Sequence, residues 1–223
     1  MRRILLLASM ALMFAAAMAL SGVAQAKTTI GGPTAAQCKN LAIKTLGKGF
    51  DPSGYTFVVG TGGNDDFTGQ ATAGNDVFCG FGGDDSIYTL DQGSIFLGGD
   101  GNDSVIKNYG TFYGGDGNDS IDSPYDGIVG ANYGTFNGGA GNDYVDVNVV
   151  DGTFNGDAGD DSVNGNNGTF NGGDGNDSVF GGNLGTFNGG AGNDYGGDNY
   201  GYFDGGAGND SVETNSGTLV DVP

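Results

Sequence analysis

Hydrophobic residues return at regular intervals along this chain, separated by polar segments rich in glycine. One apolar series follows short Asp-Ser or Asp-Tyr phrases, and a second series consists of phenylalanines that follow Gly-Thr or Gly-Tyr. The residues on either side of each series are small or polar, so period-2 alternation predicts two strands per repeat, each with one interior side chain. The expected interior residues are Val105, Ile121, Val145, Val163, Val179 and Val212 from one strand and Phe112, Phe136, Phe154, Phe170, Phe187 and Phe203 from the other.

The polar segments repeat the phrase GGxGND. Clear copies begin at Gly98, Gly114, Gly138, Gly172, Gly189 and Gly205, a variant begins at Gly156, and degenerate copies begin at Gly60, Ala71 and Gly80. The sixth position is Asp in all ten copies. Tandem repeats of this kind predict a solenoid, because each unit can bury its apolar residues only against its neighbours.

The spacing of the sixth-position aspartates assigns the turns to edges of the solenoid. From Asp85 onward the steps are 18, 16, 24, 18, 16, 17 and 16 residues. Each step is one coil, so these turns lie on a single edge. Asn-x-Gly corners, as in NYGTFY from Asn108, are expected to form the other edge through left-handed backbone and an Asn ladder, without metal. Within the 24-residue step, SPYDGIVG from Ser123 predicts an outward loop.

The repeat resembles the hemolysin-type calcium-binding (RTX) nonapeptide family, whose pattern is GGxGxDxUx with U a large apolar residue. The resemblance spans about residues 60–213. It implies an all-β fold, a right-handed parallel β-roll or β-solenoid of about 16–18 residues per coil. It also implies calcium ions between stacked turns, held by glycine carbonyls and by the sixth-position residues Asp65, Asp85, Asp103, Asp119, Asp143, Asp161, Asp177, Asp194 and Asp210.

Elementary chemistry supports the same expectation. Glycines at the first, second and fourth positions allow positive φ and tight turns in which carbonyl oxygens converge. Calcium takes six to eight oxygen ligands, more than one turn supplies, so two stacked turns must share each ion. Nine turns on one edge leave eight gaps, and we expect about six to eight ions. Asp76 falls on the opposite edge, where the position one coil later is Ser94.

Composition narrows the classes of function. The chain has 49 glycines and a net charge of −20, a balance that by itself favours disorder and opposes binding to nucleic acid or anionic membranes. It has no histidine, the usual general base. Paired aspartates also serve glycosidases and aspartic proteases, but a catalytic pair is singular and these carboxylates are repeated. We therefore expect a monomeric calcium-binding protein that is not an enzyme.

The N-terminus predicts export. Arg2 and Arg3 precede an apolar run over residues 4–20 and the small-residue site Ala24-Gln25-Ala26, which indicates a signal peptide over residues 1–26 and a secreted protein; an uncleaved membrane anchor is the alternative. Family members that leave by type I secretion usually lack such a signal. No membrane contact is expected after cleavage.

The mature chain is expected to contain an N-terminal cap over residues 27–59, the calcium-binding roll over 60–213 and a closing strand over 214–223. Residues 34–46 predict a short helix in the cap, with Gly47 after it. Cys38 and Cys79 form either a disulfide, which would attach the cap to the roll, or two free thiols.

A second function is suggested by the strand that carries Thr-Phe-Asn. With Phe inward, the flanking side chains form two outward rows that could face ice, a crystalline polysaccharide or a cell-surface ligand: Thr135, Thr153, Thr169 and Thr186, and Asn137, Asn155, Asn171 and Asn188. The structural explanation of the same rows is that Thr suits strands and that Asn ladders stabilise stacked coils.

Overall fold

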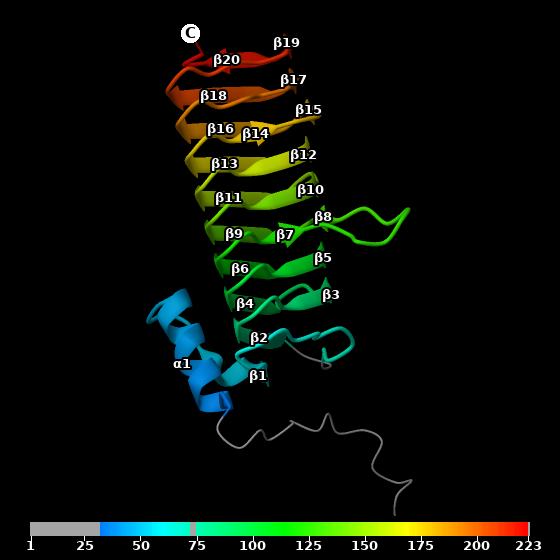
Figure 1. The fold of residues 1–223 in the computed structure, drawn as a ribbon, viewed down its shortest axis with the longest axis vertical. Helices are drawn as coiled ribbons and strands as arrows, with labels where there is room; N and C mark the ends of the chain where they lie inside the picture. Colours follow the sequence, from blue (N-terminus) through cyan, green and yellow to red (C-terminus); the bar gives the residue numbers. More distant parts are fainter. Residues whose placement is uncertain (1–31, 72–74, 223) are drawn as a thin grey trace, which may run out of the picture.

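The chain folds as a parallel β-solenoid of about ten coils with one short helix at its N-terminal end (Figure 1). The structure is a computed structural model that describes residues 32–71 and 75–222. The coils average about 17 residues, as the repeat spacing predicts. The predicted signal peptide lies outside the described residues.

Most coils contribute one strand to each of two parallel sheets, and the strands of successive coils pair in register. Sheet A contains β1 (Tyr55–Val59), β2 (Asn75–Gly82), β4 (Ile95–Asp100), β6 (Thr111–Asp116), β9 (Thr135–Ala140), β11 (Thr153–Ala158), β13 (Thr169–Asp174), β16 (Thr186–Ala191), β18 (Tyr202–Ala207) and β20 (Thr218–Val220). Sheet B contains β3 (Ser86–Leu90), β5 (Ser104–Asn108), β7 (Ser120–Ile121), β8 (Ala131–Asn132), β10 (Tyr144–Asn148), β12 (Ser162–Asn166), β14 (Ser178–Val179), β15 (Gly182–Asn183), β17 (Asp198–Asn199) and β19 (Thr214–Asn215). Two coils divide their sheet B strand into two short ones, β7 and β8 and then β14 and β15.

The core is one thin column between the sheets. The pairing register places Phe154 directly beside Phe170, and their rings stack with centroids 4.8 Å apart and planes 4° apart. All six predicted interior phenylalanines are fully buried, and so are the predicted aliphatic residues except Val212, which is partly buried. The sequence prediction of two inward ladders is therefore confirmed. Each buried Phe contributes roughly 1.5–3 kcal/mol of hydrophobic stabilisation.

The predicted helix is confirmed as α1 (Ala35–Leu46), which begins at a capping box between Thr34 and Gln37 and ends at Gly47. Its buried Cys38 and Ala42 pack with residues on the outer face of β2 and β4, so the helix covers the flank of the first coils (Figure 1). A disulfide joins Cys38 to Cys79 of β2, with 5.7 Å between the two Cα atoms. No helix within residues 32–71 and 75–222 is long and apolar enough to cross a bilayer.

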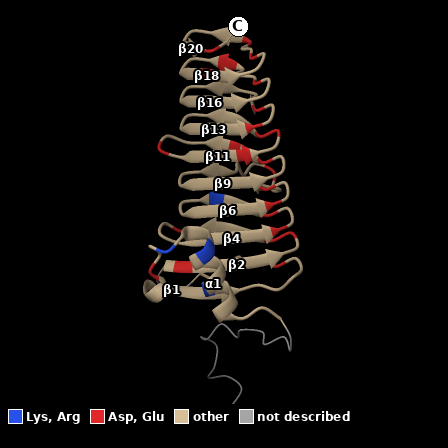
Figure 2. Cartoon of the chain, turned by 90° about the vertical axis from the view of Figure 1, so that its left-hand side faces the viewer, with Lys and Arg blue, Asp and Glu red and all other residues tan. Residues whose placement is uncertain are grey.

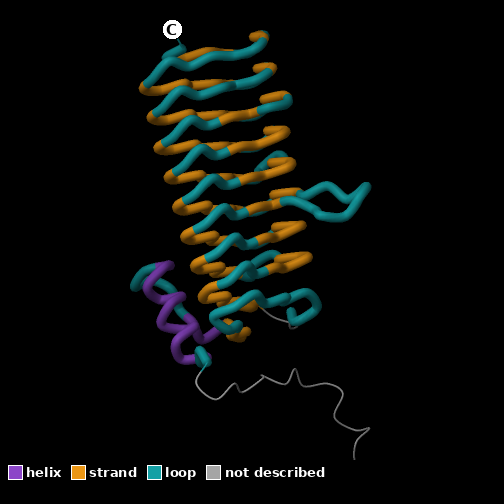
Figure 3. The backbone as a smooth tube through the Cα atoms, viewed as in Figure 1, coloured by secondary structure: helices purple, strands orange, loops and turns teal. Residues whose placement is uncertain are grey.

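One boundary differs in detail from the expected one. A short 3₁₀ helix (Pro52–Gly54) leads into β1, which pairs with β2 from Tyr55 onward, so sheet A starts inside the expected cap. The partly buried Val58 packs against the core at this end, which explains why the strand joins the sheet. The expected outward loop is confirmed: residues 122–130 leave the stack between β7 and β8 (Figure 3).

Candidate metal centre

The GGxGND turns carry the chain from sheet A to sheet B along one edge of the solenoid. In a representative coil, β6 ends at Asp116, the turn follows, and β7 begins at Ser120, directly after the sixth-position Asp119. Figure 2 shows acidic positions recurring coil after coil along an edge, with basic positions mainly around α1. The sixth-position aspartates from Asp85 to Asp210 are buried, although aspartate is a surface residue in most proteins.

These aspartates form a hydrogen-bonded ladder along the solenoid. The backbone N–H of Asp103 donates to Oδ1 of Asp119 at 2.7 Å, one coil further on. The same bond, 2.7–2.8 Å long, joins every neighbouring pair from Asp65 to Asp210. The ladder confirms that the nine predicted residues share one edge, and it uses Oδ1 of each carboxylate from Asp85 to Asp210, while Asp65 contributes only its backbone N–H.

The second oxygen of these carboxylates is buried and accepts no hydrogen bond from the described residues. The orphaned Oδ2 atoms belong to Asp85, Asp103, Asp119, Asp143, Asp161, Asp177, Asp194 and Asp210. Asp65 differs, because its Oδ2 accepts from the backbone N–H of Thr61 at 2.6 Å and from the Thr61 hydroxyl at 2.9 Å. Native proteins rarely leave a buried polar atom without a partner, so a row of eight such oxygens is a place where a proton or a cation would supply one.

Burial strongly disfavours the charged form of these groups. It raises the pKa of Asp103 to about 7 and that of Asp143 to about 8, although the hydrogen bond from the preceding aspartate lowers both. Neighbouring aspartates raise the pKa values further. The pKa also rises to about 7 in Asp85, Asp119, Asp161 and Asp177 and to about 6 in Asp194. The edge therefore needs either protons or bound cations at neutral pH.

The glycines of the turn act in two different ways. From Gly83 onward, second- and fourth-position glycines have positive φ, as expected; Gly117 has φ of 139°. The expectation of positive φ at the first position is wrong. Gly98 has no positive φ, but a methyl group there would collide with Oδ2 of Asp103 and lie 2.7 Å from the carbonyl oxygen of Gly114. The first glycine is needed for close approach, which brings a carboxylate and a carbonyl oxygen to the same place.

Backbone carbonyl oxygens add to the oxygen atoms that could bind a metal ion at this edge. A methyl group on Gly117 would collide with the carbonyl oxygen of Gly101, so this carbonyl points along the solenoid toward the next turn. Within the described coils, the carbonyl oxygens of the fourth-position glycines from Gly101 to Gly192 accept no backbone hydrogen bond. No three acidic side chains of the described residues converge on one point, so each gap offers at most two aspartates plus carbonyls. Carboxylate and carbonyl oxygens are the ligands that calcium prefers.

Asp76 lies apart from this row, as predicted. It is buried on the opposite edge, and its backbone N–H donates to the hydroxyl of Ser94 at 3.1 Å. The next coil places Ser94, not a second aspartate, beside it.

The opposite edge is closed by side-chain amides. The Asn166 amide accepts from Asn148 at 2.9 Å and donates to Asn183 at 2.8 Å and to the Thr186 carbonyl at 2.9 Å. The predicted Asn ladder is thus confirmed. Left-handed backbone at the corners is wrong for the corner glycines and is found at only one of these corners, at Asp151 with φ of 69°. Gly134 has no positive φ; it is needed because a methyl group would collide with the carbonyl oxygen of the preceding corner.

A third ladder was not predicted. It uses the fifth-position residues of the turn, where the backbone N–H of Asn118 donates to Oδ1 of Asn102 at 2.8 Å. The direction is the reverse of the aspartate ladder, because here the later coil donates to the earlier one. The signal in the sequence was the restriction of the fifth position to Asn or Asp, the two short side chains that accept from nearby backbone.

The outward Thr and Asn rows lie on the outer face of sheet A over β9, β11, β13 and β16. The Asn155 amide donates to Asn137 at 2.8 Å, and Asn171 and Asn188 continue the chain of bonds. Tyr202 and Asp204 end the rows on β18. The amides are therefore partly engaged with one another.

Comparisons with protein-family models, curated proteins and solved structures find no match to this chain.

Proposed function

We propose that this chain is an extracellular calcium-binding repeat protein of the RTX type, folded by a row of Ca²⁺ ions between its stacked GGxGND turns. The row of eight buried, orphaned Oδ2 atoms carries the proposal. Each of these atoms is an anionic oxygen without a donor, at the place where the sequence pattern expects a metal ligand.

The available ligand atoms, carboxylate and carbonyl oxygens, favour calcium over the other common metals. Zinc sites usually contain Cys or His, but the chain has no histidine and its two cysteines form a disulfide. Magnesium requires near-ideal octahedral geometry and gives up water reluctantly. Calcium accepts carbonyl and carboxylate oxygens in irregular numbers, which suits gaps that hold two aspartates each. Asp65 begins the row, so eight gaps are available and about six to eight ions are expected.

Metal binding and folding should be one process in this protein. The ionised row would place buried negative charges one coil apart, about 4.8 Å, against a core only one side chain wide. Bound cations neutralise that charge and satisfy the orphaned oxygens, so their binding free energy becomes folding free energy. Each turn borders two gaps, so filling one gap orders half of the next and binding should be cooperative.

A calcium titration followed by far-ultraviolet circular dichroism tests this function. In excess chelator at neutral pH we expect a largely disordered chain, which gains β signal sigmoidally with Ca²⁺ and poorly with Mg²⁺. The midpoint should lie near the roughly 10⁻⁴–10⁻³ M typical of extracellular modules. A chelated chain that keeps its full β signal and resists protease would show that the Asn corners and the Phe column suffice without metal.

The extracellular part of the proposal rests on the N-terminal sequence and on the disulfide. Disulfides persist in oxidising compartments, and Cys38–Cys79 pins α1 to the first coils. Expression with the native N-terminus should give a mature protein that begins at Lys27, as measured by intact mass. A product that retains residues 1–26 would support the membrane-anchor alternative.

The Thr and Asn rows favour a second candidate function, recognition of ice or of a crystalline polysaccharide. The supporting observation is the register, which aligns Thr with Thr and Asn with Asn over four adjacent strands. A thermal-hysteresis assay on the calcium-loaded protein tests the ice alternative, with Thr153→Tyr and Thr169→Tyr as variants that break the array. A wild-type protein that leaves ice growth unchanged would assign the rows to strand stability alone.

A further inference from the structure

The loop of residues 122–130 interrupts a strand without disturbing its coil. Before the loop, Ser120 pairs with Ser104 of β5; after it, Ala131 pairs with Lys107 of the same strand. The chain therefore re-enters sheet B in the register that an uninterrupted strand would have. The coil does not need this loop for closure, which leaves the loop free to serve another purpose.

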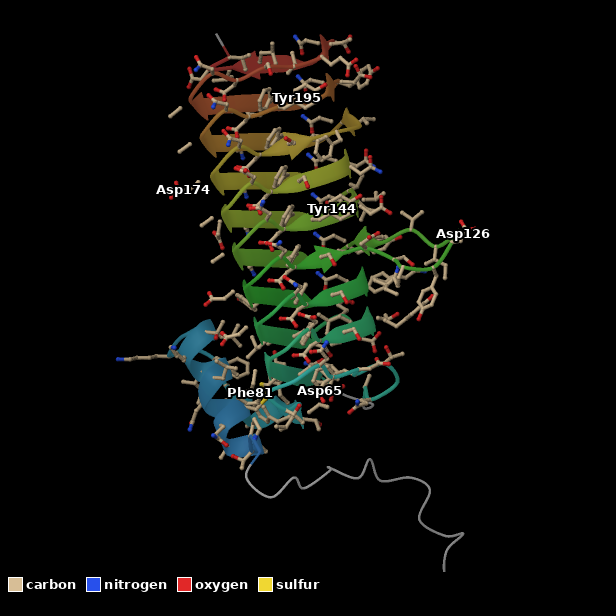
Figure 4. All side chains as sticks on the ribbon, in the orientation of Figure 1. Asp65, Phe81, Asp126, Tyr144, Asp174 and Tyr195 are labelled. Atoms are coloured by element: carbon tan, nitrogen blue, oxygen red, sulfur yellow. A yellow bond between two sulfur atoms is a disulfide. The ribbon has the colours of Figure 1, made fainter. Side chains whose placement is uncertain are left out.

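A shallow, largely open pocket of about 520 Å³ lies between this loop and the outer face of sheet B. We call it the loop cavity; its wall includes Tyr88, Lys107, Ile128, Val129, Tyr133 and Val147. Its volume is typical of sites for small molecules. Asp126 lies at the outer end of the loop (Figure 4) and is not part of the wall.

Lys107 gives the loop cavity its distinctive chemistry. It is the only Lys or Arg after residue 48, in a chain with 27 acidic residues. It nevertheless makes no ion pair within residues 32–71 and 75–222. Its neighbours in the sheet are Thr89 and Ala131, which carry no charge. A lone, half-buried cation at the wall of an open pocket, without a carboxylate partner among the described residues, points to an anionic ligand.

The rest of the wall is apolar or aromatic. Val129 is 53 % exposed and Tyr133 is 45 % exposed, values that are high for large apolar side chains close together. Tyr133 is held in place by stacking on Tyr109, with ring centroids 4.6 Å apart. A ligand with a hydrocarbon or aromatic body would cover these side chains and gain hydrophobic energy.

We propose that the loop cavity binds a small organic monocarboxylate with an apolar body. Its carboxylate would lie on the ammonium group of Lys107 and its body against Val129, Val147 and the tyrosines. The charge of the chain, −20 in total, disfavours ligands with several negative charges, because one ammonium group offsets only one of them. This site is separate from the aspartate edge and does not depend on the proposed calcium function.

Calorimetric titration of the intact protein in Ca²⁺ with 4-phenylbutyrate tests the proposal, and uncharged 4-phenylbutanol is the matched control. We expect one saturable site for the acid and clearly weaker binding of the alcohol. Lys107→Met, which keeps an unbranched side chain one atom shorter and removes the ammonium group, should lower the affinity for 4-phenylbutyrate by about tenfold, the loss of one charge-assisted hydrogen bond. Lys107→Arg should retain binding. Val129→Asp, which places a negative charge in the wall, should abolish it.

Circular dichroism and calcium stoichiometry of all three variants should match the wild type, which separates this site from the aspartate edge. The proposal is overturned by an absence of saturable binding at millimolar acid, by equal affinity for acid and alcohol, or by wild-type affinity in Lys107→Met. Binding of many molecules per chain would equally overturn it.

Discussion

The backbone N–H of Asp161 donates a 2.8 Å hydrogen bond to Oδ1 of Asp177, 16 residues later, while the Oδ2 atoms of both residues stay buried without a donor. One carboxylate oxygen thus holds the coils together and the other is available to a cation. The two roles can be separated by mutation, because an asparagine keeps the hydrogen-bond acceptor but loses the charge.

Asp161→Asn should therefore keep the ladder and lose calcium. It borders the gaps toward Asp143 and Asp177, so calorimetric titration should show about one to two fewer ions per chain. Asp76→Asn is the matched control, since Asp76 is equally buried but lies on the opposite edge beside Ser94. Equal loss of calcium in both variants would contradict the assignment of metal to one edge.

The chelated protein should become more stable on acidification, contrary to most proteins. Burial raises the folded-state pKa of seven aspartates to between about 6 and about 8, from an ordinary value of 3.8. A raised pKa means that the folded chain binds more protons, so this stabilisation is complete below pH 4 and is lost as the pH rises through 6 to 8.

Circular dichroism in chelator from pH 4 to pH 8 checks this prediction. We expect β signal at the acidic end and its loss toward the alkaline end. The calcium-loaded protein should respond in the opposite sense, because protons compete with the metal for the same oxygens. A chelated chain whose β signal does not depend on pH would show that the aspartate row is not buried as described.

Gly117→Ala should destabilise the calcium-loaded protein by at least about 1–3 kcal/mol. Gly117 has a positive φ, and the new methyl group would also collide with the Gly101 carbonyl oxygen. Gly165→Ala is the matched control: no atom lies within 4 Å of the added carbon and φ is not positive. We expect the control to be neutral or slightly stabilising. Thermal unfolding in Ca²⁺ compares the two, and similar shifts in both would be evidence against the close-approach argument.

Asn166→Ala should lower the free energy of unfolding by about 2–4 kcal/mol. It removes one of the two acceptors of the buried Asn148 amide and the donor to Asn183 and to the Thr186 carbonyl. Asn155→Ala breaks the similar ladder on the outer face of sheet A, where water can replace the lost bonds. Denaturant unfolding in Ca²⁺ should therefore rank Asn166→Ala well below Asn155→Ala in stability. A lower stability of Asn155→Ala than of Asn166→Ala would mean that the hydrogen bonds of the outer Asn row, and not those of the corner Asn ladder, contribute more to the stacking of the coils.

Most of the fold was predictable because the repeat leaves few alternatives. A step of 16–18 residues fixed the coil, and alternation around Phe154 and Val163 fixed the interior. The position of Cys79 at an early repeat allowed the disulfide to be anticipated, although free thiols remained an alternative until the structure placed Cys38 beside it.

The details that escaped sequence reasoning depend on contacts between coils. Gly98 and Gly134 both look like turn glycines in the sequence, but each is required by an atom of its own or a neighbouring turn, which no local pattern reveals. The orphaned Oδ2 row likewise emerges only when Oδ1 is seen to be occupied. Lys107 has no signal in the sequence, because a single lysine forms no motif; its chemical role depends on the pocket beside it.

The disulfide between Cys38 and Cys79 makes the two ends of the solenoid mechanically unequal. A force applied to the C-terminus would peel β20 and its coil from the stack first, and under the proposed function each released turn would give up the calcium ion that it shares with the next. Covalent linkage would stop the unwinding at β2. In a medium rich in calcium, such a protein would behave as a tether that lengthens in steps of one coil and rewinds when the load is removed.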